Sequence, residues 1–168
     1  MATTETHTGD AVEVLDKARD IKIAIVTTHD EDGGLRGRPL TLLEAEGDAT
    51  LWFFVEAFSE VAVDVGLDSR ISASFADAGK SWYVSITGLG YIVHDPCKAE
   101  ALWTPLAAAW FPGGPQDPTL GLLRIDADYV EYWKPGPGGK LMQFAAMAKA
   151  AMTRKPPKSV GEHGSFAP

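Results

Sequence analysis

Residues 36–65, RGRPLTLLEAEGDATLWFFVEAFSEVAVDV, decide the fold. They contain two extended runs separated by the turn residues Gly47 and Asp48, followed by Ser59, which begins a helical pattern. Just upstream, isoleucines at 21, 23 and 25 alternate with other residues, and DEDGG at 30–34 has hairpin-turn chemistry. We therefore expect three neighbouring antiparallel strands in meander order.

Three more strands are predicted downstream, where apolar residues again recur with a period of two. These runs cover 71–78, 81–94 and 121–134, and Gly88 and Gly90 predict a bend or bulge in the second of them. Six strands joined mostly by hairpins, without a repeating strand–helix rhythm, close most simply into a small antiparallel barrel. The fold class is therefore mainly β, a six-stranded antiparallel barrel with flanking helices.

Helices are predicted at few places. One follows Asp10, a second follows Ser59, a third follows the capping pair Asp95-Pro96, a short fourth covers the apolar segment PLAAAWF that begins at Pro105, and a fifth covers 140–152. The domain organisation that we expect is a disordered N-terminus at 1–9, one barrel domain over 10–152, and an extended C-terminal tail at 153–168.

Composition and charge exclude several classes of function. The formal net charge of −8 argues against binding to nucleic acid or to an anionic membrane surface. No apolar run approaches the ~20 residues of a transmembrane helix, and no signal peptide is visible. Cys97 is the only cysteine, so we expect a small structural apolar residue there and a cytoplasmic location for the protein.

No catalytic or metal-binding motif stands out. The histidines lack HExxH spacing, the serines lack a GxSxG elbow, and no phosphate-binding Gly-Lys-Ser/Thr loop is present. Glu44 and Glu46 alternate along a strand and are expected to face solvent rather than to act as a catalytic carboxylate pair. We expect no metal ligands and no general acid or base.

Arg38 and the residues after it form the first candidate binding segment. A guanidinium suits bidentate contact with a phosphate, although on this residue alone a surface ion pair is the commoner role. Pro39 has no amide hydrogen for a sheet ladder, which favours a strand edge or a bulge. The backbone of Leu40 and Thr41 would then be available to a ligand.

Ser59 and two groups of aromatic residues are the remaining candidates. Ser59 at a helix start can present its hydroxyl and the following amides to an anion, or act only as an N-cap. Aromatics at 52–54 are more often core residues, whereas Trp110 and Phe111 precede a Gly- and Pro-rich loop. Large aromatics beside such a loop suit a planar ligand or a subunit contact.

Taken together, these segments resemble a known family. IAIVTTHDEDGGLRGRPLTL, DATLWFFVEAFSE, ISASFADAGKSWYVSITGLGYIVHD, the WFPGGPQDP loop and the GEHG tail are similar to the general-stress-protein branch of the flavin-binding split-barrel proteins, relatives of pyridoxamine 5′-phosphate oxidase. The resemblance covers nearly the whole chain, and the loop and tail are its more specific marks.

This resemblance implies a split barrel of the FMN-binding type that forms a homodimer with two flavin sites at the subunit interface. Carried over by position, Arg38 holds the FMN phosphate, Ser59 caps it, and Trp110 and Phe111 close the site from the partner subunit. The remaining cofactor-binding residues line the ring and ribityl chain: Pro39, Leu40, Thr41, Phe53, Phe54 and Val55.

One departure from the family pattern follows the serine. The family usually has a basic residue two positions after it, whereas Ser59 is followed by Glu60 and Val61. Losing a charge-assisted contact and adding like charge each cost on the order of 1–3 kcal/mol of binding. We therefore expect weakened FMN binding, with FAD, a deazaflavin or a haem as alternative ligands.

Three functions fit these residues. The first is an FMN-dependent oxidoreductase of unknown substrate, in which the cofactor supplies the electron chemistry. The second is a non-catalytic flavin-binding or stress-response protein. The third is a degenerate member of the family that no longer binds flavin and persists as a dimeric scaffold.

Overall fold

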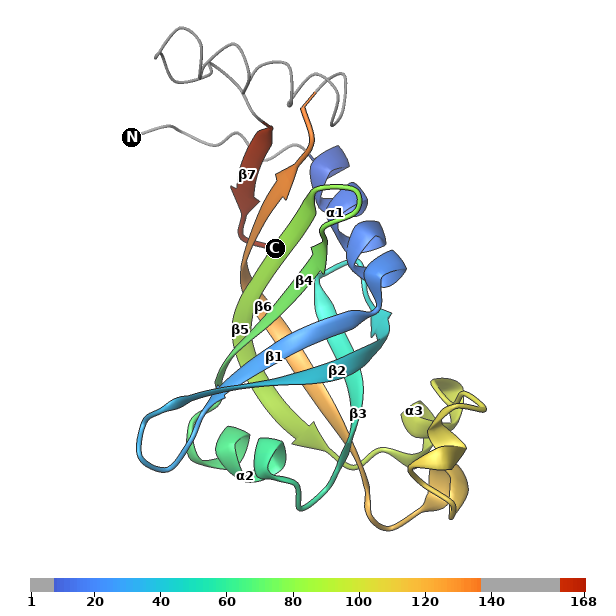
Figure 1. Cartoon of the computed structure of the whole chain (residues 1–168). Coiled ribbons are helices and arrows are strands. Elements are labelled where there is room, and N and C mark those ends of the chain that lie inside the picture. Colours follow the sequence, from blue (N-terminus) through green and yellow to red (C-terminus); the bar gives the residue numbers. More distant parts are fainter. Residues whose placement is uncertain (1–7, 137–160) are drawn as a thin grey trace, which may run out of the picture.

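The computed structural model describes residues 8–136 and 161–168, and its helices and strands are shown in Figure 1. The strands are β1 (Ile23–His29), β2 (Leu35–Ala45), β3 (Thr50–Glu56), β4 (Arg70–Asp77), β5 (Trp82–Val93), β6 (Leu120–Lys134) and β7 (Glu162–Phe166). The helices are α1 (Thr8–Ile21), α2 (Glu60–Leu67) and α3 (Pro96–Ala101), with the short 3₁₀ turns η1 (Ala107–Ala109) and η2 (Gly114–Gln116).

Strands β1 to β6 form a closed antiparallel barrel. Their order is β3-β2-β1-β4-β5-β6, and a further pairing of β3 with β6 closes the cylinder. Side chains along β1 alternate between the inside and the outside of the barrel. Ala24, Val26 and Thr28 are buried inside, while Ile23 and Ile25 face outward. The predictions of a mainly β fold, of six barrel strands and of an initial three-strand meander are confirmed.

Strand β2 is paired with β3 along only part of its length. The β1–β2 ladder runs from Ile23↔Thr41 to His29↔Leu35, whereas the β2–β3 ladder is given only by Leu42↔Phe53, Glu44↔Trp52 and Ala45↔Leu51. A bulge between Leu42 and Glu44 interrupts that second ladder. The segment 35–41 is therefore bonded to β1 on one side and has an open edge on the other, as Pro39 had indicated.

Two apolar clusters hold the helices against the barrel. The larger one fills the barrel and includes Val14 and Leu15 of α1, and Val61 and Val65 of α2. Figure 1 shows α2 at one end of the barrel.

The smaller cluster packs the segment that follows β5 against the outside of β3 and β6. Its buried members are Trp52, Ala99, Phe111, Leu120 and Leu122. This cluster fixes the position of α3 and of the 3₁₀ turns beside the open strand edge.

Gly88 lies at a bulge in the β5–β6 ladder, where the register shifts between Thr87 and Gly88. A Cβ atom at this position would lie 2.0 Å from the backbone oxygen of Asp126 and 2.9 Å from Cα of Ala127. Only glycine fits such a close approach of two backbones, so the predicted bulge is confirmed and has a steric cause.

The end of the chain forms a strand rather than a separate tail. Strand β7 pairs with β6 from Val130↔Phe166 to Lys134↔Glu162, and Phe166 is buried in the barrel cluster. Residues 162–166 therefore belong to the sheet, whereas the expected domain bounds of 10–152 and 153–168 stay predictions. Gly164 allows this docking, since a Cβ there would lie 2.4 Å from the Tyr132 hydroxyl oxygen.

Several other expectations concern the helices and Cys97. Helix α1 begins at Thr8, inside the segment expected to be disordered, while residues 1–7 and the helix predicted over 140–152 lie outside the described residues. Cys97 is exposed on α3, so the expectation of a structural apolar cysteine is wrong.

In the described parts of the chain, no helix has the length and apolarity needed to cross a membrane.

Candidate ligand site at the open strand edge

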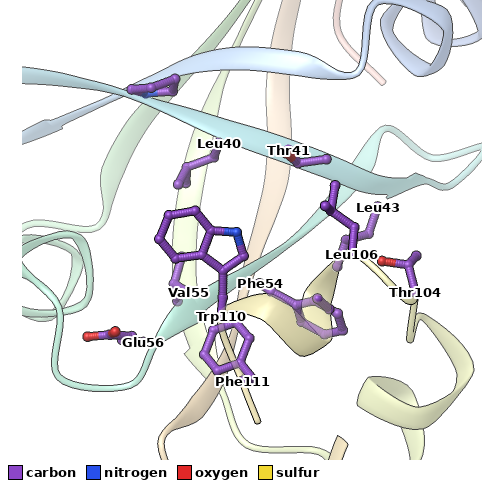
Figure 2. Close-up of a pocket in the computed structure, with 12 residues that line it drawn as sticks. Leu40, Thr41, Leu43, Phe54, Val55, Glu56, Thr104, Leu106, Trp110 and Phe111 are labelled. Atoms are coloured by element: carbon purple, nitrogen blue, oxygen red, sulfur yellow. The ribbon is translucent and has the colours of Figure 1, made fainter. Parts of the chain in front are cut away.

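A cavity of about 300 Å³ lies where β2 separates from β3. Strand β2 supplies Pro39, Leu40, Thr41 and Leu43, and β3 supplies Phe54, Val55 and Glu56. The segment after β5 closes the cavity with Thr104, Leu106, Ala107, Trp110 and Phe111 (Figure 2). Its walls are mainly apolar and aromatic, and Glu56 is the one ionisable residue among those that line it.

The aromatic wall combines an anchored ring with an exposed one. Phe111 is 5% exposed, and its ring centroid lies 6.2 Å from that of Phe54 in an edge-to-face arrangement. Trp110 is 76% exposed, and in Figure 2 its indole extends toward Leu40. A flat cavity between such rings and an open strand edge suits a planar, largely apolar ligand.

Most of the predicted site residues meet at this cavity. Pro39, Leu40, Thr41, Phe54, Val55, Trp110 and Phe111 all line it. Trp110 and Phe111 line this cavity from the same chain as β2 and β3, because Phe111 is buried in the cluster that packs this segment onto its own barrel. That they close the site from a partner subunit stays a prediction.

Phe53 does not line the cavity. It is fully buried in the barrel cluster, because successive side chains of a strand point to opposite faces and Phe54 takes the outer one. The structure therefore places Phe53 in the barrel core, away from the cavity wall, and its contact with a bound ring stays a prediction.

Arg38 lies beside the cavity, next to Pro39, with its side chain turned toward α2. Its Nη1 donates a hydrogen bond to Thr28 Oγ1 at 3.0 Å, and its Nη2 lies 3.1 Å from Glu60 Oε2 and 3.2 Å from Asp64 Oδ2. Arg38, Glu60 and Asp64 do not line the cavity itself. They form the polar end of the site beside it, where two carboxylates of the same chain already contact the guanidinium.

Ser59 caps α2. Its hydroxyl oxygen accepts a hydrogen bond from the Ala62 amide at 3.4 Å, and the hydroxyl donates one to the Glu56 carbonyl oxygen at 2.7 Å. Both contacts are local, so the N-cap interpretation of Ser59 is confirmed. Its contact with a phosphate stays a prediction.

Val61 faces the core rather than the cavity. It is 4% exposed within the barrel cluster, so a lysine at this position would have to leave the core to reach a ligand phosphate. Of the two residues that depart from the family pattern, Glu60 is therefore the one placed to affect the polar end.

Sequence reasoning missed five lining residues: Leu43, Glu56, Thr104, Leu106 and Ala107. Leu43 points into the cavity because the β2 bulge adds one residue there, and nothing in the sequence marks that bulge. For Leu106 and Ala107 the sequence did contain a signal, because both belong to the short apolar segment from Pro105 that also contains Trp110.

Lys98 fixes the wall-forming segment to the barrel. Its Nζ lies 2.6 Å from Glu44 Oε2, 2.8 Å from Glu46 Oε1 and 4.8 Å from the centroid of the Trp52 ring. Burial alone would lower the pKa of Lys98, but hydrogen bonds and charge from Glu44 and Glu46 outweigh it and raise that pKa above its usual value. The two glutamates are partly exposed, and their role is to hold α3 in place.

Metal binding has no support in the part of the chain that the structure describes. Within residues 8–136 and 161–168, no three or more His, Cys, Asp or Glu side chains are grouped so as to hold a metal ion.

Comparison with known proteins gives a consistent result. The model of the family described as pyridoxamine 5′-phosphate oxidase like matches residues 10–158. Protein bli-3 of Neurospora crassa is 30% identical over 121 residues, which are 66% of this chain and 58% of that protein, so the chain spans little more than half of this relative's length.

Solved structures show the same fold. The general stress FMN/FAD binding protein of Xanthomonas citri is 32% identical with a TM-score of 0.62, over 73% of this chain and 89% of that one. A protein from Jannaschia sp. CCS1 described as a candidate general stress protein 26 has a TM-score of 0.74 at 22% identity, over 96% of this chain and 99% of that one, and shows similarity of fold alone.

Replacing Lys98 by Met should loosen the wall of the cavity. We expect a loss of about 1–2 kcal/mol of stability, a melting temperature lower by about 3–6 °C, and faster hydrogen exchange in residues 96–111. Because the pKa of Lys98 is raised on folding, its contribution is complete below pH ~10 and is lost as the pH rises through the higher folded-state pKa.

The matched control for this prediction is Lys80→Met, which removes an exposed turn lysine and should leave the exchange of residues 96–111 unchanged. Unaltered exchange in the Lys98 variant would show that the apolar cluster alone holds the segment.

Proposed function

The chain belongs to the pyridoxamine 5′-phosphate oxidase-like family, and from this premise we propose that it is a flavin-binding general stress protein whose cavity between β2 and β3 holds the flavin ring. FMN is the cofactor proposed, with FAD and a deazaflavin as alternatives. The name of the Xanthomonas citri protein, which includes FMN/FAD binding, supports the ligand class. A cytoplasmic location belongs to the same proposal and rests on the single cysteine.

The observation that carries the proposal is the shape and chemistry of the cavity. A volume of about 300 Å³ suits a ring system rather than a whole dinucleotide. Thr41 offers backbone groups at the open strand edge, and Trp110 offers an aromatic face. The residues present therefore fit the ring of a flavin, while Arg38 provides only a partly neutralised contact for its phosphate.

We further propose that the protein is an FMN-dependent oxidoreductase. A bound flavin supplies the electron transfer, and the residues of the chain bind and orient it. Glu56 is the one ionisable side chain on the cavity wall, which agrees with a role limited to positioning. The non-catalytic alternative uses the same residues, and the contacts of Glu60 with Arg38 favour the alternative in which FMN binds weakly.

Flavin binding is the first test of this proposal. Adding FMN or riboflavin to the purified protein should shift the visible spectrum and quench flavin fluorescence. Trp110→Ala should weaken binding of both flavins by roughly tenfold, because the stacked ring is lost. Phe58→Ala is the matched control, since Phe58 is 87% exposed and is not among the cavity-lining residues. Equal effects of the two substitutions would place the ring elsewhere.

Turnover separates the enzyme from the binding protein. We expect the flavin-loaded protein to be reduced by NADH, NADPH or a reduced deazaflavin, followed as bleaching of the flavin absorbance under anaerobic conditions. A holoprotein that none of these donors reduces would leave the non-catalytic function as the better proposal.

We also propose a homodimer formed beside the cavity. Ile23 and Ile25 on the outer face of β1 are 50% and 47% exposed, and they pair with Thr41 and Pro39, which line the cavity. A second copy of the chain packed on this face would bury these isoleucines and approach the ligand.

Ile25→Glu should convert this dimer into a monomer in light scattering coupled to size exclusion, because a carboxylate would be buried in the interface. Val12→Glu is the control, since it places the same charge at an exposed apolar position on α1. A wild-type monomer, or a dimer that persists in the Ile25 variant, would rule out this interface.

A further inference from the structure

At the polar end of the site, beside the cavity, Arg38 lies between two carboxylates of different character. Asp64 is a buried residue of α2 whose carboxylate accepts a hydrogen bond from Thr28 Oγ1 at 2.7 Å, and its side chain is 8% exposed. Glu60 is the first residue of α2, and its side chain is 85% exposed. Both contact Nη2 of Arg38, but only Asp64 is held in place by a second group.

Thr28 and Asp64 therefore fix the position of the guanidinium. Nη1 of Arg38 donates to Thr28 Oγ1, and the same hydroxyl donates to Asp64, so the two side chains form a continuous buried support for Arg38. Removing Asp64 from its place would leave a buried carboxylate without its partners, which is costly. An arriving anion cannot readily displace it.

Glu60 can be displaced, because its carboxylate is exposed and contacts Arg38 through a single 3.1 Å hydrogen bond. The carboxylate takes up an Nη2 donor that a phosphate bound to this side of the guanidinium would use. It also lies in the first turn of α2, where the helix dipole favours a negative charge. A phosphate reaching Arg38 from the cavity must therefore expel Glu60 and then remain near a negative charge.

We propose that Glu60 determines ligand specificity at this site by acting as an internal competitor for the phosphate position on Arg38. The cavity then takes flavins with an uncharged tail, such as riboflavin, more readily than family members with a basic residue in this region would. Asp64 and Thr28 are positioning residues for Arg38. This inference rests on the proposed function, since it concerns the tail of a flavin whose ring is bound between β2 and β3.

A purely structural role of Glu60 leads to a different expectation. If its carboxylate only stabilises the first turn of α2, replacing it changes the melting temperature and leaves the relative affinities of riboflavin and FMN the same. If it competes with a phosphate, replacing it changes FMN binding and leaves riboflavin binding the same. The difference between the two flavins is therefore the informative measurement.

The test is to titrate riboflavin and FMN, by quenching of flavin fluorescence, into the wild type, Glu60→Gln and Glu100→Gln. Glu60→Gln should tighten FMN binding about tenfold and change riboflavin binding less than twofold, because the competing charge is removed only at the phosphate position. Glu100→Gln removes the same charge from an exposed position on α3 and should change neither affinity.

A second pair of variants assigns the gain to Arg38. In the Glu60→Gln background, Arg38→Gln should abolish the tenfold gain for FMN, whereas Glu100→Gln should preserve it. Circular dichroism and thermal melting check whether each variant is folded. Glu60→Gln tests the inference even if the Arg38 variant does not fold.

Two outcomes overturn the inference in distinguishable ways. If both flavins bind and Glu60→Gln changes their affinities equally or not at all, Glu60 is not a competitor, and the proposed flavin site stands. If neither flavin binds any variant, the proposed function itself is wrong, and the inference fails with it.

Discussion

The incomplete pairing of β2 with β3 is the constraint on which the rest of the site depends. The barrel closes through the β3–β6 ladder, so β2 does not need β3 along its whole length. Pro39 has no amide hydrogen for a ladder, and the bulge at Leu43 interrupts the ladder with β3. The resulting open edge exposes backbone groups that a ligand can bond, without weakening the closure of the barrel.

The segment between β5 and β6 converts this open edge into a cavity. Apolar packing of Phe111 with Trp52 and Leu122, together with the ion pairs of Lys98, fixes the segment against the outside of the barrel. Trp110 is then held beside the strand edge while its own ring stays largely exposed. A ring with a fixed backbone and an open face is well placed to stack on a planar ligand or on a second subunit.

The two ends of the site differ in how well they suit a phosphorylated flavin. The ring end is apolar and aromatic, and a flavin ring gains there by burial and stacking. At the other end, Arg38 interacts with Asp64 and Glu60. An incoming phosphate would therefore gain less binding free energy than it would from an unpaired guanidinium. The affinity for the ring and the affinity for the phosphate are therefore set by separate groups of residues.

The sequence by itself determined the strand pattern, the cap of α2 at Ser59, the cap of α3 at Asp95 and the open edge at Pro39. These features depend on local periodicity and on turn or capping chemistry, which neighbouring residues specify. The sequence also brought the aromatic residues at 110–111 into the site. Only the tertiary structure decided that Phe53 and Val61 face the core, that Leu43 enters the cavity, and that Asp64 supports Arg38. The apolar run LWFF does not say which face of the strand is inside. The contacts of Arg38 with Glu60 and Asp64 join residues more than twenty positions apart, which meet only when α2 packs onto the end of the barrel.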